Sequence, residues 1–289
     1  MNRSIKSSLG KLSVNINGDS RVDWVQRAKL IEKAGLSTVW VGEFDQFLDP
    51  FEVAEKIAQE TSLNVGFGVL TVKRPLEEII KKLEELRKIF GERFIVGLGA
   101  GKYDAAKLAY MKVKKYAELL ADDYPVFIGA SSPKLADLSE RFDGLLINAV
   151  KPEFVRWLKR RTFNASYGPS LLLPSDYEID LVLASLLVFL GHKRLVLEFG
   201  LARTFRDLSC LNIDDLIKKR MLGLNLDEPK VKNYRDFLVE NFAICGREDL
   251  FIEKLKNLLS YCDHVVLADP FFRDLKSLEF LEVLVCEVC

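Results

Sequence analysis

Leu63-Asn-Val-Gly-Phe-Gly-Val-Leu-Thr-Val-Lys-Arg-Pro75 is the stretch that decides the fold of this chain. Its β-branched and aromatic residues predict a strand over residues 63–70. Gly66 and Gly68 interrupt that strand, and glycine inside a strand marks a bulge or a close approach to the backbone. If the carboxyl end of this strand opens on a barrel mouth, the glycines predict a floor for a flat ligand. The alternative is a packing bulge without a ligand.

Short apolar strands and helical patterns alternate on both sides of this stretch. The predicted strands are residues 11–16, 38–41, 63–70, 94–98, 125–128, 144–149, 171–173 and 264–268. Helical patterns separate nearly all of them, and Asp19 and Ser20 are expected to cap the first helix. Such alternation implies parallel pairing through right-handed crossovers. Eight units in 289 residues favour a (β/α)8 TIM barrel, in the α/β class, over an open doubly wound sheet.

The connection between the seventh and eighth predicted strands is too long for one crossover. Its pattern is mostly helical, with a short extended segment at residues 241–246. We therefore predict a helical insertion over about residues 175–260, which covers the barrel mouth or makes a subunit contact. No repeat or linker breaks the chain, so residues 1–289 are predicted to form a single domain.

Composition excludes several classes of function. The chain has 42 Lys plus Arg and 42 Asp plus Glu, so no net charge recruits nucleic acid or an anionic membrane. The longest apolar run, residues 181–190, is too short to span a bilayer, and the interpretation is a cytoplasmic protein. Abundant Lys and Glu with little His fit a thermophilic source. Five cysteines without framework spacing predict no metal site.

Small and polar residues follow the fifth and sixth predicted strands. Gly129, Ala130, Ser131 and Ser132 lead into a helix, and backbone N–H groups with hydroxyls at such a place suit an anion. Asn148 and Lys151 follow the next strand, where Lys151 would pair with a phosphate held by the preceding loop. The alternatives are an ordinary Ser-Pro helix start and a solvated lysine.

Candidate acid–base residues follow the second predicted strand. Glu43 and Asp45 are the best-placed carboxylates, and their alternative roles are helix capping or solvation. Gly99 lies in the glycine-rich turn after the fourth strand, which exposes backbone to a ligand. His192 and His264 have no partnering motif, so a hydrolytic triad is not expected.

Taken together, these segments resemble the bacterial luciferase-like superfamily, above all its coenzyme F420-dependent branch with methylenetetrahydromethanopterin reductase. The matching segments are residues 28–35 with 39–41, 66–69 with 74–75, 93–101, 125–133, 143–149, 245–249 and 263–270. Their order and spacing extend over nearly the whole chain.

The resemblance implies a barrel with a deazaflavin or flavin at its carboxyl-end mouth. In that superfamily a non-prolyl cis peptide in a bulged third strand lies behind the ring, and the matching bond here is Gly68–Val69. The phosphate pocket would fall on Gly129, Ala130, Ser131, Ser132, Asn148 and Lys151, with Gly99 also at the cofactor. A homodimer is the assembly that the resemblance leads us to expect.

The chain departs from the superfamily pattern at three places. Asn15 stands where many relatives carry an acid, residues 43–45 replace a common His, and Lys102 replaces an Asp. The leading hypothesis is an F420-dependent oxidoreductase that transfers hydride to or from a one-carbon pterin or a carbonyl-like substrate, with Glu43 or Asp45 orienting or protonating it. The alternatives are an FMN-dependent monooxygenase and a non-catalytic relative that retains only the barrel.

Overall fold

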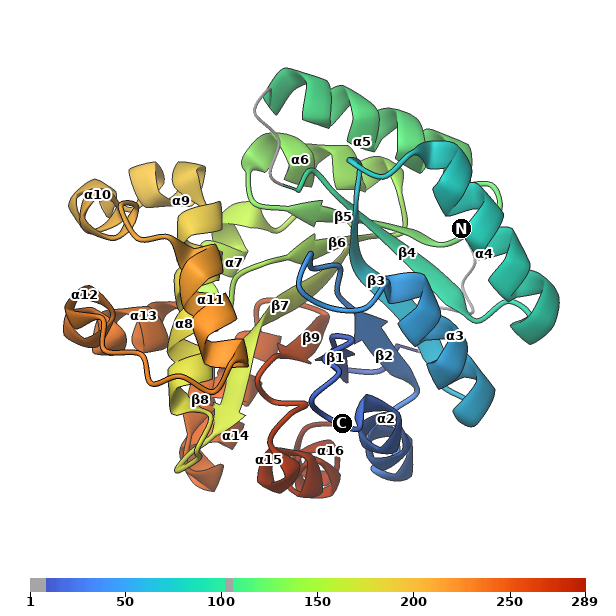
Figure 1. Ribbon diagram of the computed structural model, residues 1–289. Coiled ribbons are helices and arrows are strands. Elements are labelled where there is room, and N and C mark those ends of the chain that lie inside the picture. The colour runs from blue at the N-terminus through green and yellow to red at the C-terminus, as the bar shows by residue number, and fades with distance from the viewer. Residues whose placement is uncertain (1–8, 102–105) are drawn as a thin grey trace.

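The computed structural model, which describes residues 9–101 and 106–289, contains a closed barrel of eight parallel strands with helices around it (Figure 1). The barrel strands are β1 (Leu12–Ile16), β2 (Thr38–Val41), β3 (Asn64–Thr71), β4 (Phe94–Gly99), β5 (Val126–Ala130), β6 (Gly144–Ile147), β7 (Phe163–Leu172) and β9 (His264–Ala268). Strands β1 to β7 pair in chain order, and β9 pairs with both β7 and β1. This closure confirms the predicted (β/α)8 barrel.

Helices cover the outside of the barrel and present one apolar face to it. They are α2 (Trp24–Lys33), α3 (Pro50–Glu60), α4 (Leu76–Phe90), α5 (Ala106–Leu120), α6 (Pro133–Leu138), α7 (Pro152–Leu158), α14 (Glu248–Leu259), α15 (Leu275–Glu279) and α16 (Leu281–Val288), with the 3-10 turn η1 (Ser139–Arg141). Helix α4 shows the pattern, because Leu76, Ile79, Leu83 and Leu86 are its buried residues and recur at helical spacing.

The seventh strand was predicted in the wrong place. Residues 171–173 were expected, whereas β7 begins at Phe163 and ends at Leu172. The missed part contains small and polar residues with Gly168 and Pro169, so it lacks the apolar run that identifies a buried strand. These residues are nevertheless mostly buried. The buried hydroxyl of Ser166 is satisfied, because it donates a hydrogen bond to the carbonyl oxygen of Ala149 at 2.6 Å.

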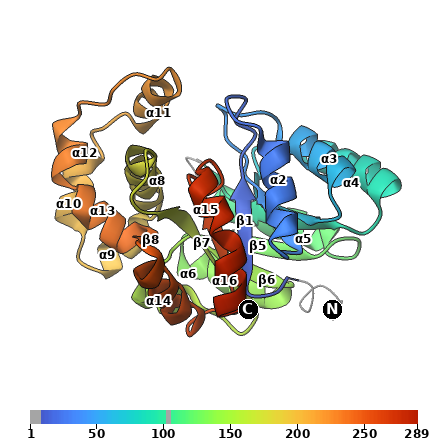
Figure 2. The same cartoon turned by 90° about the horizontal axis from the view of Figure 1, so that it is seen from below.

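Helices fill most of the long connection between β7 and β9. They are α8 (Glu178–Gly191), α9 (Lys193–Glu198), α10 (Ala202–Leu208), α11 (Ile213–Met221), α12 (Pro229–Asn233) and α13 (Arg235–Phe242), and the short strand β8 (Ile244–Gly246) follows. These helices gather on one side of the barrel, with α8 nearest to it (Figures 1 and 2). Strand β8 pairs with the carboxyl half of β7 and lies outside the closed ring.

Aromatic side chains fill the barrel interior. Trp40 and Phe127 are fully buried and meet edge to face, with their ring centroids 5.7 Å apart. Glycines make room for them, because a Cβ atom at Gly66 would lie 2.4 Å from Trp40 and one at Gly144 would lie 2.2 Å from Phe127. The glycine at position 66 therefore serves packing in the barrel. None of the helices in the described part of the chain is long and apolar enough to cross a membrane.

Candidate active site

A cavity of about 830 Å³ opens at the carboxyl ends of the barrel strands. Its volume is in the range of small-molecule and cofactor sites, roughly 300–1,000 Å³. Polar side chains come from the strand ends, and apolar side chains come from α8 and α11, including Leu183, Leu187 and Ile217. In parallel barrels this end of the strands carries the ligand and the reacting groups.

The floor of the cavity is the bulged end of β3. The register between β3 and β4 shifts between Phe67 and Leu70, and the Gly68–Val69 peptide bond is cis, as the resemblance implies. The side chain of Val69 lies against two glycines of the neighbouring strands. A Cβ atom at Gly99 would be 2.5 Å from Cγ2 of Val69, and one at Gly129 would be 2.7 Å from Cγ1. These glycines give Val69 the space to project at the centre of the floor.

Glu43 lies at the cavity but its hydrogen-bonding capacity is largely used. Its Oε2 accepts from the backbone N–H of Thr71 at 2.6 Å, and its Oε1 accepts from Nε and Nη2 of Arg74 at 3.0 and 2.9 Å. Arg74 also pairs with Asp49 and Glu78. We call Arg74, Glu43, Asp49 and Glu78 the Arg74 cluster. Asp45 also lines the cavity, at an exposed position.

The predicted phosphate-binding residues divide into two groups. The first group lines the cavity, together with the other residues predicted to bind the cofactor. These lining residues are Gly68, Val69, Gly99, Gly129, Ala130, Ser131 and Asn148. Ser132 and Lys151 are not among its lining residues. The ammonium group of Lys151 donates to Oδ1 of Asn241 at 2.6 Å, on helix α13, which explains why it does not extend into the cavity. Lys102 lies outside the described residues.

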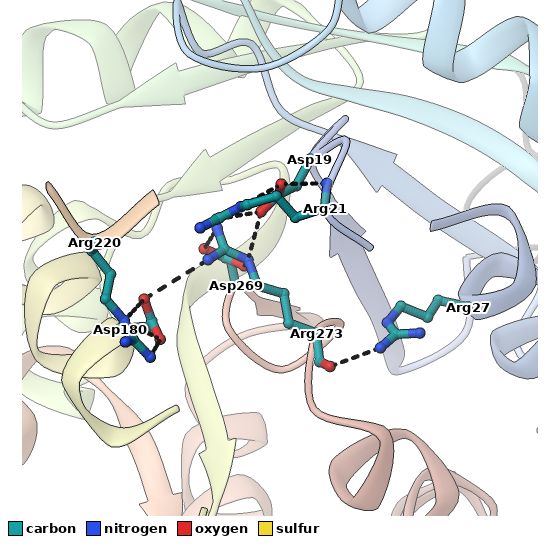
Figure 3. Close-up of polar contacts among 7 residues, drawn as sticks. All are labelled: Asp19, Arg21, Arg27, Asp180, Arg220, Asp269 and Arg273. Atoms are coloured by element: carbon teal, nitrogen blue, oxygen red, sulfur yellow. Dashed lines mark hydrogen bonds and ion pairs between the residues drawn. The ribbon is translucent and has the colours of Figure 1, made fainter. Parts of the chain in front are cut away.

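The structure adds a set of buried ion pairs that sequence reasoning missed (Figure 3). Its members are Asp19, Arg21, Asp180, Arg220, Asp269 and Arg273, which we call the Arg273 cluster. Asp19 was expected to cap a helix, but α2 is capped by Asp23, and the Asp19 carboxylate pairs with both Nε and Nη2 of Arg21 at 2.9 and 2.6 Å.

Arg273 lies at the centre of this cluster. Its Nη2 donates to Oδ2 of Asp269 at 2.8 Å, its Nε lies 3.6 Å from Asp19, and its Nη1 lies 3.8 Å from Asp180. Asp180, on α8, is in turn bound by Arg220 of α11 through Nε and Nη2 at 3.1 and 3.0 Å. The cluster thus connects the ends of β1 and β9 to the helices that form the outer wall of the cavity.

Two titratable groups also line the cavity: Tyr167, in the middle of β7, and Asp269, directly after β9. The pKa of Asp269 is raised to about 6, mainly by burial; the charge of Arg273 opposes this rise, and the nearby carboxylates of Asp180 and Asp19 add to it. Burial, together with Asp269, raises the pKa of Tyr167, so its phenol stays protonated. Sequence reasoning also missed Asp269, although its place directly after a correctly predicted strand is a signal that could have found it. Tyr167 was missed because that part of β7 was not predicted.

The two histidines are both buried and neutral. Burial lowers the pKa of each to about 4. His264 has partners, since its Nε2 lies 2.6 Å from Oγ of Ser13 and its Nδ1 lies 3.1 Å from the carbonyl oxygen of Gly10. Neither ring nitrogen of His192, at the cavity wall, makes a well-formed hydrogen bond. Within residues 9–101 and 106–289, no group of three or more His, Cys, Asp or Glu is arranged to hold a metal ion.

Comparison with known proteins yields matches of structure and none of sequence. No protein-family model matches the chain, and no curated protein matches it. The coenzyme F420-dependent tetrahydromethanopterin reductase of Methanopyrus kandleri has the same fold, with a TM-score of 0.71 and 15% identity over 96% of this chain and 98% of the other.

Two further enzymes have this fold over nearly their whole length. An F420-dependent secondary alcohol dehydrogenase, solved with an F420-acetone adduct, gives a TM-score of 0.67 at 15% identity over 97% of this chain and 99% of the other. EDTA monooxygenase from Chelativorans sp. BNC1 gives a TM-score of 0.65 at 12% identity, over 96% of this chain and 93% of the other. The predicted resemblance to the luciferase-like superfamily is therefore confirmed for the fold.

Proposed function

We propose that the protein is a luciferase-like oxidoreductase that binds a deazaflavin, coenzyme F420, in the cavity at the barrel mouth. The observation that carries the proposal is the cavity itself, in a barrel of the same fold as two F420-dependent enzymes. Its volume, its apolar outer wall and its bulged floor suit a flat heteroaromatic ring. The side chain of Val69 occupies the space beside Gly99 and Gly129 on this floor.

The residues present fit such a group. Val69 would contact the ring face, and Ala130, Ser131 and Asn148 would hold the polar part of the cofactor, because they line the same cavity at the ends of β5 and β6. When bound in its reduced form, a deazaflavin supplies a hydride to an electrophilic carbon.

The chain's own residues supply the environment for that transfer. The apolar faces of α8 and α11 exclude water from the cavity, and the Arg273 cluster fixes these helices to the strand ends. The Arg74 cluster holds the segment after β3 in place through Glu43. These contacts position a cofactor and a small substrate side by side, which is the main requirement for hydride transfer.

FMN is the alternative cofactor. The likeness to EDTA monooxygenase has a TM-score of 0.65, close to the 0.67 of the alcohol dehydrogenase, so the fold supports both. A flavin monooxygenase on this scaffold would shield its reactive oxygen chemistry behind the same apolar wall.

The test is a fluorescence titration of the purified protein with coenzyme F420 and, separately, with FMN. Ala184 lies on α8 and lines the cavity, whereas Ala202 lies exposed on α10. We expect micromolar F420 binding by the wild type and by Ala202→Trp, and binding weakened by about tenfold or more in Ala184→Trp, since the indole fills the cavity. Preference for FMN would support the monooxygenase. Binding of neither cofactor would contradict the proposal and favour a non-catalytic barrel.

A further inference from the structure

We infer that Arg21 and Arg220 bind the anionic group of the substrate, so that the substrate is a small acid with a carboxylate or phosphate group. This inference rests on the proposed function for the cofactor. It goes beyond that function by assigning a second binding site in the same cavity and the charge of the molecule that occupies it. Both arginines belong to the Arg273 cluster and come from different elements, Arg21 from the segment after β1 and Arg220 from α11 (Figure 3).

Each of these arginines is held by a carboxylate along only one edge of its guanidinium group. Asp19 accepts hydrogen bonds from Nε and Nη2 of Arg21 at 2.9 and 2.6 Å. Asp180 accepts from Nε and Nη2 of Arg220 at 3.1 and 3.0 Å. Among the residues that the structure describes, none accepts a hydrogen bond from Nη1 of either arginine. The edge formed by Nη1 and Nη2 therefore remains available on both, and such an edge binds a carboxylate or phosphate through two parallel bonds.

The two arginines face the cavity, and their partners lie behind them. Both line the cavity, and the side chains of Arg21 and Arg220 are 36% and 28% exposed. The side chains of Asp19 and Asp180 are only 0% and 8% exposed. The buried carboxylates thus compensate the charge from within, while an anion in the cavity meets the free edges of the guanidinium groups.

Both guanidinium groups are fixed before an anion binds. Asp19 also accepts a hydrogen bond from the backbone N–H of Arg21 at 3.0 Å, so one carboxylate holds the main chain and the side chain together. Nε of Arg220 contacts both oxygens of Asp180, at 3.1 and 3.2 Å, and Arg273 lies 3.8 Å from the same carboxylate. Donors that are already ordered bind a ligand without a further loss of side-chain freedom.

The other cationic groups at the cavity are less suited to an anion. Each guanidinium nitrogen of Arg74 contacts a carboxylate of the Arg74 cluster. Arg273 is buried and pairs with both oxygens of Asp269, so these two charges satisfy each other. Lys73 is exposed, and no carboxylate in the described part of the chain fixes it. Arg21 and Arg220 combine a fixed position with free donors.

The site lies away from the residues that would hold the polar part of the cofactor. Those residues follow β5 and β6, whereas Arg21 follows β1. In the closed ring, three strands lie between β1 and β5 in either direction. Arg220 comes from α11, in the outer wall of the cavity. The pair is therefore placed to hold a second molecule beside the cofactor.

The wall next to the site is apolar. Leu183 and Leu187 share a face of α8 with Asp180, at positions i+3 and i+7, and both line the cavity. Ile217 precedes Arg220 by one turn of α11 and also lines the cavity. A molecule whose anionic group pairs with the arginines thus has its remaining part against α8 and α11. This arrangement favours an acid with an apolar body over a sugar acid or another strongly polar one.

The first test measures anion binding to the protein saturated with coenzyme F420, by isothermal titration calorimetry. The probes are benzoate and phenyl phosphate, with benzamide as the neutral counterpart of benzoate. We expect at least one of the anions to bind about tenfold or more tightly than benzamide, because charge-assisted hydrogen bonds hold its charged group. The anion that binds more tightly identifies the group that the site prefers.

Conservative variants test which residues form the site. Arg21→Lys and Arg220→Lys keep a positive charge beside the buried carboxylates, which preserves the fold, but lose the planar donor edge. Each should weaken binding of the preferred anion by about fivefold or more, while the affinity for F420 stays within about twofold. Arg203→Lys is the matched control at an exposed position of α10 and should leave both affinities unchanged.

Chemical modification of the wild type gives a readout that needs no variant. Phenylglyoxal reacts with accessible guanidinium groups, and mass spectrometry of the digested protein gives the rate at each arginine. A saturating concentration of the preferred anion should slow the modification of Arg21 and Arg220 by about fivefold or more and leave that of Arg203 unchanged.

Different results would overturn different parts of the account. Equal affinity for the anions and benzamide, unchanged anion affinity in both lysine variants, or unprotected Arg21 and Arg220 would overturn the anion site. A loss of F420 affinity by about tenfold or more in the lysine variants would show that the arginines hold the cofactor, which overturns the substrate assignment. A wild type that binds no F420 would overturn the proposed function and with it this assignment, and the separate F420 titration distinguishes this case.

Discussion

The cavity has two arginine–carboxylate clusters with three carboxylates each, and these carboxylates differ in burial. In the Arg74 cluster one arginine is shared by three carboxylates, of which Asp49 and Glu78 are 40% and 42% exposed. In the Arg273 cluster the side chains of Asp19, Asp180 and Arg273 are all at most 9% exposed. The same kinds of side chain therefore meet different dielectric surroundings.

This difference sets how far each charge depends on its ion-pair partners. In a partly exposed cluster the solvent stabilises each charge, and the arginine serves to hold Glu43 and the end of β3 together. In a buried cluster each charge depends on its partners, and burial raises the pKa of Asp269 to about 6 although Arg273 pairs with both of its oxygens. Glu43 is buried to a similar degree, so the charged neighbours as well as burial distinguish the two strand-end carboxylates.

The largest expected effect on stability comes from replacing the central arginine of a cluster. Arg273→Met leaves Asp269 buried without its cation and should lower the free energy of unfolding by about 3–5 kcal/mol at pH 8. The loss should be smaller at pH 5, where Asp269 carries its proton. Arg74→Met, in contrast, should cost about 1 kcal/mol, since Asp49 and Glu78 are well exposed and Glu43 keeps its hydrogen bond from the N–H of Thr71. Urea unfolding at both pH values measures the losses, and equal losses for the two variants would refute the comparison.

The next prediction concerns the protonation state of the two buried histidines. The unfolded imidazole binds a proton below about pH 6.5 but the folded one only below about 4, so stability falls as the pH drops through this range. Between pH 7 and pH 5 the free energy of unfolding of His192→Leu should therefore fall by about 2 kcal/mol less than that of the wild type. Asp269 contributes in the opposite direction, because its folded pKa is raised, and wild type and variant share that contribution.

His264→Leu is the matched control for that prediction. It removes the same titration, but it also leaves Ser13 and the carbonyl of Gly10 without their partner. Its free energy of unfolding should therefore be lower than that of the wild type already at pH 7, by about 1–3 kcal/mol. Thermal or urea unfolding at pH 7 and pH 5 measures the stability of both variants. An unchanged acid slope in His192→Leu would show that His192 is protonated in the folded protein.

The smallest expected effect on stability concerns the cavity floor, at the bulged end of β3. Arg74 follows this strand. Gly99→Ala places a methyl group against Val69 and should cost about 1–2 kcal/mol through overpacking. The double variant Gly99→Ala with Val69→Ala should recover part of this loss, as a double-mutant cycle reports. Gly191→Ala is the control, since nothing lies within 4 Å of its Cβ position. Additive losses would mean that Val69 does not occupy the space beside Gly99.

Much of the fold could be predicted from the sequence because strand and helix patterns alternate clearly. The glycines of β3 also pointed to a bulge, and the bulge is present. Strand β7 was misplaced because Gly168, Pro169 and the polar residues before them hide a buried strand. The resulting gap concealed Tyr167.

The site was harder to predict than the fold because partnering depends on tertiary structure. Glu43 and Asp45 are carboxylates that follow a strand end, as acid–base residues do. The sequence does not show, however, that Arg74 and the N–H of Thr71 donate hydrogen bonds to both oxygens of Glu43. Similarly, Lys151 lies where a phosphate ligand was predicted, and its contact with Asn241 involves a residue 90 positions away. The Arg273 cluster joins residues of α8 and α11 with residues of the segments after β1 and β9, which no local pattern brings together.

The most direct test of the central claim is a crystal structure of the protein with coenzyme F420. The account predicts the deazaflavin ring on the floor of the cavity, in van der Waals contact with Val69 at roughly 4 Å, with Tyr167 and Asp269 facing the space beside it. A ring bound elsewhere on the molecule, or a cavity that stays closed to the cofactor at saturating concentration, would contradict it.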